Sequence, residues 1–313
     1  RDDLNKVMDT MFLLLTNSDS IYKQIVLWKK ANRIEVIYKN YTQTHTVLKL
    51  MTQRSFTRLL LRAFNIVALS TCLLWVLYPV ILYVQRKPVE FAIWLPFDAN
   101  LSPQFYIAAL YVWVQTSWLA FSNTTMDVFI TFFLVQCKTQ LSILRLDLEQ
   151  IVGKSKEEAV KTSGDFTNIL ERRLKIVLLF SGVIQEIFGG AVLYQFLVSG
   201  WIICTTAYRT IDPMSVEFVS MVLYMCCILT ELFMFCYYGN EVTHESEKLI
   251  ESAYALDWLE IPIKYKRAII IFMERIKRTV NLVAGNLIPL SNSTFVSVVR
   301  SSYTFYAFLK NTN

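Results

Sequence analysis

Four long apolar runs restrict this chain to a small set of folds. They cover residues 60–84, 105–135, 175–205 and 214–238, and a helix needs about 20 mostly apolar residues to cross a bilayer. The chain is 54% hydrophobic, against about 45–50% for soluble domains. Because backbone groups in lipid must be hydrogen-bonded within the protein, these runs predict an all-α, polytopic membrane protein.

The stretch 7–28 is a weaker candidate span. Its apolar ends flank a polar centre that runs from Thr16 to Ser20. Because polar groups are costly in lipid, such a span is expected to be buried among other helices or to face a cavity.

The last apolar stretch is broken near its middle. Pro289 lacks a backbone N–H, and polar residues follow it at 291–293. We therefore expect one last helix in two halves, a cytoplasmic half at about 268–290 and a short final span at about 293–310. This gives six spans within a single domain over residues 1–313.

Lys and Arg residues orient these spans. The segments 23–62, 138–175 and 239–278 hold 24 of them, whereas 86–104 and 206–217 hold three. Since cytoplasmic loops carry the positive excess, the long segments should face the cytoplasm, and the short loops and the C-terminus should face outward. The chain does not open on Met, so we expect one further span upstream. Seven spans with a cytoplasmic N-terminus are the inverse of a G-protein-coupled receptor.

The basic segments also carry apolar stripes. Leu141, Leu144, Leu148 and Ile151 recur at helical spacing and predict an apolar face. Such a face needs packing partners. We therefore predict that the spanning helices extend into a cytoplasmic anchor bundle.

No pattern for catalysis or metal binding is present. The six cysteines lie within or at the ends of apolar runs without a CxxC pair, and His45 and His244 are far apart in sequence. Glycine-rich phosphate loops and GxSxG motifs are absent. We therefore expect no enzyme activity, no cofactor and no metal. The basic loops account for the net charge of +6, so nucleic acid is not an expected partner.

Hydroxyl side chains form a stripe along the final span. The stripe comprises Ser293, Ser297, Ser301 and Thr304 and continues to Phe308 and Asn311. Residues three and four apart share one helix face. Around a symmetric axis this face would line a wet pore that an apolar constriction closes. The alternative is that small hydroxyl residues mediate helix packing.

Charged residues inside the spans are further candidates. Arg300 either tunes ion passage or points toward a carboxylate or backbone carbonyls. Its position about 100° from Ser301 favours the second reading. Asp127, Glu186 and Glu231 could relay protons, but we expect structural pairing with a neighbouring helix.

A channel and a secondary transporter are both compatible with these features. Discontinuous helices often form transport sites, so the broken last segment favours a transporter. The absence of an inverted internal repeat argues against one. An intramembrane enzyme is the weakest alternative because paired catalytic groups are lacking.

The C-terminal part of the chain resembles the insect odorant receptors. Four stretches carry the match, CYYGNEV (236–242), AYALDW (253–258), LVAGNLIPLS (282–291) and VRSSYTFYAFLK (299–310). Their order and spacing are similar to the family's C-terminal signature. The rest of the chain matches in the order of spans and the lengths of loops.

This resemblance implies a tuning subunit of a heterotetrameric, odorant-gated, non-selective cation channel. Its partners would be the odorant co-receptor Orco, a small volatile odorant, permeating cations and the lipid bilayer. It would lie in the plasma membrane of olfactory sensory neurons, with the N-terminus cytoplasmic and the C-terminus extracellular. The co-receptor has a longer second cytoplasmic loop than residues 138–175 provide. Gustatory receptors are a related alternative, but their TYxxxxxQF ending is absent.

The family places its odorant pocket among the outer halves of the spans, and an odorant needs an apolar, aromatic site with few polar contacts. Each candidate could instead serve ordinary helix packing. The candidates are Met11, Phe12, Leu15, Cys72, Trp75, Val76, Pro79, Tyr83, Tyr111, Trp113, Thr116, Ala120, Met221, Tyr224, Met225 and Ile228.

Alignment with the family on Thr304 places its gate at Phe308 and Thr312, with Asn311 near the outer mouth. The co-receptor has aliphatic residues at both gate positions, so its subunits are expected to supply most of the seal. The predicted pore-lining residues are Ser297, Ser301, Thr304, Phe308, Asn311 and Thr312. Asn100 begins an N-glycosylation sequon in an outer loop.

Overall fold

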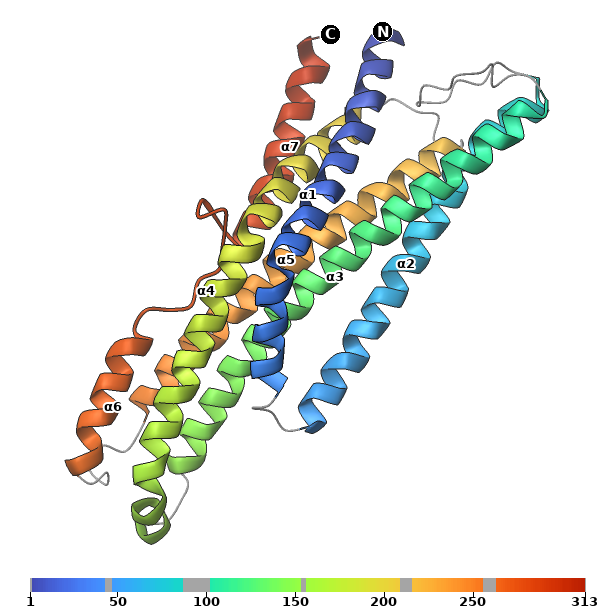
Figure 1. The fold of residues 1–313 in the computed structure, drawn as a ribbon. Coiled ribbons are helices and arrows are strands. Elements are labelled where there is room, and N and C mark those ends of the chain that lie inside the picture. The colour runs from blue at the N-terminus through green and yellow to red at the C-terminus, as the bar shows by residue number, and fades with distance from the viewer. Residues whose placement is uncertain are drawn as a thin grey trace. The chain divides into compact units, whose positions relative to one another are not determined.

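In the computed structural model, helices make up almost all of the chain (Figure 1). The structure describes residues 2–42, 47–86, 102–152, 156–208, 216–255 and 263–312. The elements are α1 (Asp2–Thr42), α2 (Val47–Val84), α3 (Gln104–Val152), α4 (Lys156–Tyr208), α5 (Val216–Tyr254), α6 (Ile263–Ile276), β1 (Val283–Ala284), β2 (Ile288–Pro289) and α7 (Asn292–Thr312). The predicted all-α class is confirmed.

Four helices are long and apolar enough to cross a membrane. Within the described residues these segments are Ser55–Val84, Gln104–Glu149, Glu171–Thr206 and Phe218–Tyr254, and they overlap the four apolar runs. At 1.5 Å per residue, the 49 residues of α3 cover roughly 74 Å, whereas the hydrocarbon core is about 30 Å thick. The helix therefore extends well beyond the bilayer.

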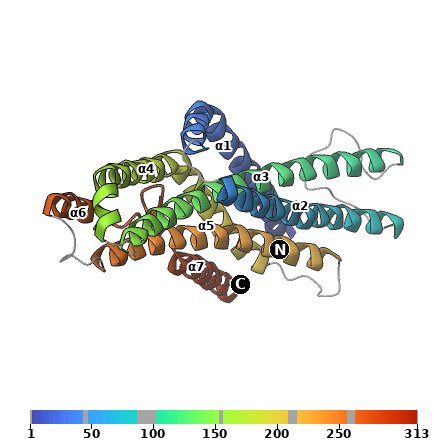
Figure 2. The same ribbon diagram turned by 90° about the horizontal axis from the view of Figure 1, so that it is seen from below.

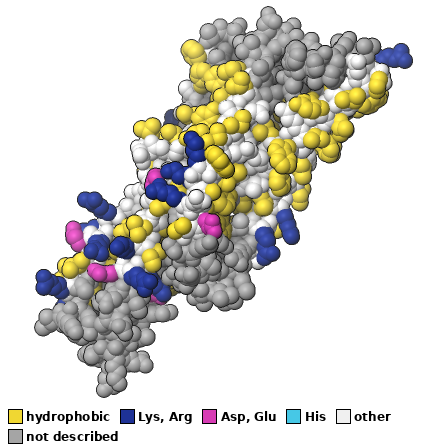
Figure 3. All heavy atoms as spheres, viewed as in Figure 1, with side chains coloured by type: hydrophobic (Ala, Val, Ile, Leu, Met, Phe, Trp, Pro, Cys, Tyr) yellow, Lys and Arg dark blue, Asp and Glu magenta, His cyan; other side chains and the backbone are white. Residues whose placement is uncertain are grey.

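Large hydrophobic side chains are exposed over much of the surface (Figure 3). Trp28, Trp118 and Val84 are 81%, 75% and 73% exposed. Monomeric soluble proteins rarely expose apolar patches beyond a few hundred Å². Surface of this kind is what contact with lipid or with partner subunits requires.

The chain divides into two compact units. Unit 1 comprises Arg1–Ile130, Leu193–Phe233 and Phe295–Asn313, and unit 2 comprises Thr131–Val192 and Met234–Thr294. The helices α3, α4 and α5 contribute residues to both units.

The core of unit 2 contains the apolar stripe of α3. Leu141, Leu144 and Leu148 are each at most 1% exposed, as their spacing predicts, while Ile151 has a side chain outside the described set. Polar contacts reinforce the packing of α3. The Lys138 Nζ lies 2.5 Å from Glu241 on α5, and Arg145 Nε lies 3.4 Å from Glu245.

A two-stranded hairpin in unit 2 separates α6 from α7. Its register pairs Val283 with Pro289 and Ala284 with Ile288. Gly285 and Asn286 have φ of 55° and 59°, as in a type I′ turn, which glycine and asparagine tolerate best. We expected residues 268–290 to be helical. Instead α6 ends at Ile276, and the positive-φ turn and Pro289 keep residues 285–289 from being helical.

Two close approaches hold the hairpin in place. The Gly285 N–H donates to the Gly189 carbonyl of α4 at 2.8 Å. On α5, a Cβ added at Gly239 would lie 2.3 Å from the Cβ of Leu290 and 2.7 Å from its carbonyl oxygen. Only glycine allows the chain after β2 to lie this close to the helix.

In unit 1, α2 and the start of α3 lie side by side (Figures 1 and 2). Tyr83 stacks on Phe105, with ring centroids 3.9 Å apart and an interplanar angle of 6°. Phe105 and Ala109 form a buried cluster, against which Val76 and Tyr83 pack.

Candidate functional site

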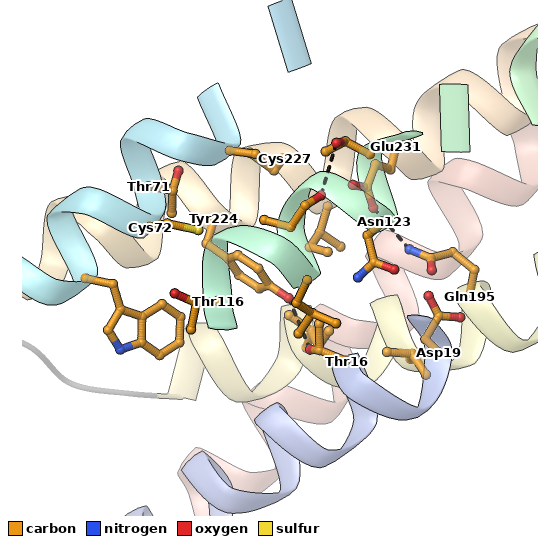
Figure 4. Close-up of a pocket in the computed structure, with 18 of the residues that line it drawn as sticks. Thr16, Asp19, Thr71, Cys72, Thr116, Asn123, Gln195, Tyr224, Cys227 and Glu231 are labelled. Atoms are coloured by element: carbon orange, nitrogen blue, oxygen red, sulfur yellow. Dashed lines mark hydrogen bonds between the residues drawn. The ribbon is translucent and has the colours of Figure 1, made fainter. Parts of the chain in front are cut away.

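A cavity of about 100 Å³ lies within unit 1. Its lining comes from five helices and is shown in Figure 4. The lining residues are Thr16, Asp19 and Lys23 of α1; Ala68, Thr71, Cys72 and Trp75 of α2; Thr116, Leu119, Ala120, Asn123 and Thr124 of α3; Gln195, Val198 and Ile202 of α4; and Tyr224, Cys227, Ile228 and Glu231 of α5. A cavity of roughly 150 Å³ is known to bind benzene, so this one is of the scale of a very small organic molecule.

One end of the cavity is apolar and aromatic. Trp75 and Tyr224 meet edge to face, with ring centroids 6.5 Å apart. The Tyr224 hydroxyl lies 3.3 Å from Thr16 Oγ1, so its polar tip is satisfied. Trp75 and Tyr224 pack against a buried cluster that includes Val198 and Ile228. These side chains give the cavity a wall suited to hydrocarbon and aromatic groups.

The other end of the cavity is polar. Lys23 is 3% exposed, and its ammonium lies 2.8 Å from Asp19 Oδ2, 2.7 Å from Asp127 Oδ1 and 2.7 Å from Gln195 Oε1. Gln195 in turn donates to Glu231 Oε2 at 3.1 Å. Buried charges are tolerated when they are paired and hydrogen-bonded, and this network joins α1, α3, α4 and α5.

Sequence reasoning missed the polar end of the cavity. We counted Lys23 as a cytoplasmic basic residue, whereas it is buried in an ion pair. Its spacing of four residues from Asp19 is the available signal, because that spacing brings two side chains together on a helix. The polar centre of the 7–28 stretch did indicate a cavity-facing or buried span, and Thr16 and Asp19 line the cavity.

The interior acidic residues have different environments. Asp127 pairs with Lys23 of a neighbouring helix and Glu231 accepts from Gln195, in line with the expected structural pairing. Glu186 is exposed.

The structure brings six of the predicted ligand-binding residues together around the cavity. These are Cys72, Trp75, Thr116, Ala120, Tyr224 and Ile228. Leu15 lies nearby and packs against the buried Val198 cluster. Odorant binding by these residues stays a prediction.

The other predicted ligand-binding residues do not line this cavity. Val76 and Tyr83 pack around Phe105, and Met11, Tyr111 and Trp113 are exposed. Pro79, Met221 and Met225 are half-buried elsewhere in unit 1, and the side chain of Phe12 lies outside the described set. The difference is one of helix rotation, which the apolar content of a span does not specify.

The helix α7 presents an exposed face and a buried face. Ser297, Ser301, Thr304 and Phe308 are all exposed, and Arg300 is exposed as well. The side chains of Asn311 and Thr312, and all of Asn100, lie outside the described residues. The pore-lining role of this stripe therefore stays a prediction.

Side chains of α7 also contact α4 and α5, and the most buried of them is Ser302. Ser302 Oγ donates to the Gly200 carbonyl of α4 at 3.1 Å. The Phe305 ring lies 6.5 Å from the Trp201 ring, and the Phe295 ring lies 5.5 Å from Phe233. Gly200 and Trp201 lie between Val198 and Ile202, which line the cavity. One turn of α4 thus touches both the cavity and α7.

Long apolar helices that line a small cavity define a helical membrane protein with room for a small ligand. The family model described as 7tm Odorant receptor matches residues 6–303. The chain belongs to this family, which is one of receptors and not of enzymes.

Relatives in two insects support this membership. Odorant receptor 94a of Drosophila melanogaster is 25% identical over 74% of this chain and 60% of its own length, and odorant receptor 22b of that species is 23% identical over 74% and 58%. The chain therefore spans about three-fifths of these relatives. Odorant receptor Or1 of Anopheles gambiae is 23% identical over 99% of this chain and 82% of its own length.

A solved structure has the same fold. The insect olfactory receptor OR5 from Machilis hrabei, in complex with eugenol, superposes with a TM-score of 0.84 over 99% of this chain and 82% of that chain, at 15% identity. The structure of OR5 alone gives a TM-score of 0.82. This likeness establishes the fold.

Proposed function

We propose that this chain is the odorant-binding subunit of a ligand-gated, non-selective cation channel that assembles with the odorant co-receptor as a heterotetramer. The observation that carries the proposal is the cavity of unit 1 in a chain of the odorant receptor family. Its Trp75–Tyr224 wall offers aromatic surface to a small volatile molecule, which suits the few-polar-contact chemistry of such sites.

The proposed pore lies along the exposed face of α7. Ser297, Ser301 and Thr304 place hydroxyls along one stripe, and Phe308 adds an apolar side chain that closes a pore by dewetting. The remaining proposed pore residues are Asn311 and Thr312. In the tetramer, the co-receptor subunits complete the ring and supply most of the hydrophobic seal.

The proposed coupling runs through one turn of α4. A ligand displaces Val198 and Ile202, and the intervening Gly200 and Trp201 contact Ser302 and Phe305 of α7. Packed interiors transmit small displacements because they do not compress. Ser302→Ala, which removes the hydrogen bond to Gly200, tests this path.

The basic residues support a plasma-membrane orientation with a cytoplasmic N-terminus and an extracellular C-terminus. Removing the buried Lys23 from the count of 24 leaves 23 basic residues in the proposed cytoplasmic segments against three in the outer loops. The bias that orients membrane proteins is therefore preserved.

Co-expression with the co-receptor in oocytes, followed by current recording against an odorant panel, tests the proposal. We expect inward cation current with at least one odorant and none from cells that lack this chain. A surface-expressed complex that gives no current with any odorant but takes up substrate would favour the transporter alternative.

A further inference from the structure

Lys23 and Gln195, the two donor side chains of the ion-pair network, have committed their hydrogen-bond donors. The three ammonium hydrogens of Lys23 are taken by Asp19, Asp127 and Gln195, at 2.7–2.8 Å. The Gln195 amide donates to Glu231 at 3.1 Å and to Ser199 at 3.3 Å. An ammonium has three donors and an amide nitrogen two, so both groups are fully used.

Acceptor atoms are left over at the same place. Asp19 Oδ1, Asn123 Oδ1 and Asp127 Oδ2 are buried and have no hydrogen-bond partner. Asp19 and Asn123 line the cavity (Figure 4). The Asp19 side chain is only 4% exposed. Buried polar atoms are normally hydrogen-bonded, so the oxygens of these two lining residues indicate a donor that is supplied from within the cavity.

The carboxyl groups point the same way. Asp19 and Glu231 line the cavity and Asp127 pairs with Lys23, so three carboxyl groups surround one basic side chain. A metal ion does not take up these acceptors, because the described residues contain no group of three or more His, Cys, Asp or Glu side chains suited to hold one. A head group with an N–H or O–H donates to the leftover oxygens, whereas a head group that only accepts leaves them unsatisfied and is limited to the Asn123 amide nitrogen.

We propose that this cavity selects small amphiphiles with a protic head group, an alcohol or an amine, over ketones, esters and ethers of the same shape. The inference rests on the proposed function and adds the chemical class of the ligand. The head group donates to Asp19 and Asn123, while the hydrocarbon part lies against Trp75 and Tyr224. A hydrogen bond to a charged group favours the protic member of a matched pair by about 10- to 100-fold.

The test compares ligands that differ only in the head group. The probes are 2-butanol, 2-butylamine and butanone, together with cyclobutanol and cyclobutanone, which suit the small volume of the cavity. They are applied to oocytes that express this chain with the co-receptor. We expect half-maximal concentrations for the alcohols or the amine at least about tenfold below those of the ketones. Equal potency of alcohol and ketone, or a preference for the ketone, would overturn the proposal.

Three variants test which residues produce the preference for alcohols over ketones. Asn123→Leu removes one acceptor and is expected to shrink the alcohol-to-ketone ratio toward one. Asp19→Asn keeps an oxygen for Lys23 and places an N–H where Oδ1 stood, so it is expected to raise ketone potency. Ser70→Ala, on α2 and outside the lining, is the matched control and should leave the ratio unchanged, because the exposed Ser70 hydroxyl donates to the Val67 carbonyl of its own helix. A ratio that Ser70→Ala alters as much as Asn123→Leu does would also overturn the proposal.

A binding measurement separates this inference from the channel proposal. The purified receptor is heated in detergent with 2-butanol or butanone, since a ligand that binds the folded state raises the unfolding temperature. Stabilisation by the alcohol alone, without current in oocytes, would retain the protic site and remove the channel function. Current with esters or ketones but no stabilisation by the alcohol would retain the channel function and remove the protic site.

Discussion

The close approach of Gly239 to Leu290 predicts a strong effect of a single methyl group. In Gly239→Ala the new Cβ would lie 2.3 Å from the Leu290 Cβ and 2.7 Å from its carbonyl oxygen. Because backbone atoms are involved, a rotamer change cannot relieve the clash, and the segment after β2 must move away from α5.

The cost can be estimated from three contributions. Overpacking costs about 1–3 kcal/mol, and re-exposing Leu290, which is 7% exposed, costs about 1.5–3 kcal/mol. Alanine is favoured over glycine in a helix by about 1 kcal/mol. We therefore expect Gly239→Ala to destabilise the protein by roughly 2–5 kcal/mol.

Gly182→Ala is the matched control. Gly182 also lies in a helix of unit 2, and an added Cβ there meets nothing within 4 Å. It should therefore be neutral or stabilising by up to about 1 kcal/mol. The assay is the temperature at which a fluorescently tagged receptor in detergent loses half of its monodisperse chromatographic peak. A Gly239→Ala midpoint equal to the wild type, or an equal loss in both variants, would refute the reasoning.

Four further predictions address the site and the pore. Lys23→Met leaves buried carboxylates without their cation and should lower the free energy of unfolding by about 3–5 kcal/mol, which is measured as a loss of surface expression. The control is Lys277→Met at an exposed site, which should leave surface expression unchanged. Normal expression of both variants would contradict the buried network. Tyr224→Ala should shift odorant sensitivity and leave single-channel conductance unchanged, and a change in conductance alone would place the ligand elsewhere. Phe308→Ala should raise leak current or alter ion selectivity, and unchanged permeation would remove it from the pore. Ser302→Ala loses the bond to α4 and should lower maximal current at equal surface expression, while an unaltered maximum would argue against coupling through this contact.

The fold was predictable wherever a local pattern determines it. Apolar runs predicted the spanning helices, and the three- and four-residue spacing of Leu141, Leu144 and Leu148 predicted the buried face of α3. The hairpin was missed, although Gly285, Asn286 and Pro289 are each disfavoured inside a helix. A proline break indicates where a helix stops but not what replaces it.

The candidate site was predictable only in part, because it depends on how helices rotate against one another. Trp75 and Tyr224 line the cavity, whereas Tyr83 and Met225, from the same helices, do not. The Asp19–Lys23 spacing was readable as a local pair. The contributions of Gln195 and Asn123 come from helices far apart in sequence, and no local pattern marks them.

The composition of α7 has a consequence for the making of the receptor. Among the described helices α7 is not one of the four apolar enough to enter a membrane by composition, and a central Arg such as Arg300 costs about 2.5–3.5 kcal/mol during insertion by the translocon. Its contacts with α4 and α5 must therefore supply the favourable free energy of insertion that its own side chains do not provide. We expect α7 to integrate only after those helices are in place. Insertion can be followed with a glycosylation acceptor placed beyond Thr312. The acceptor should be modified efficiently in the whole chain but poorly when α7 follows an unrelated span. Equal modification in both settings would show that α7 inserts unaided. Biosynthesis, and with it the number of receptors that leave the endoplasmic reticulum, would depend on a helix that cannot enter the bilayer alone.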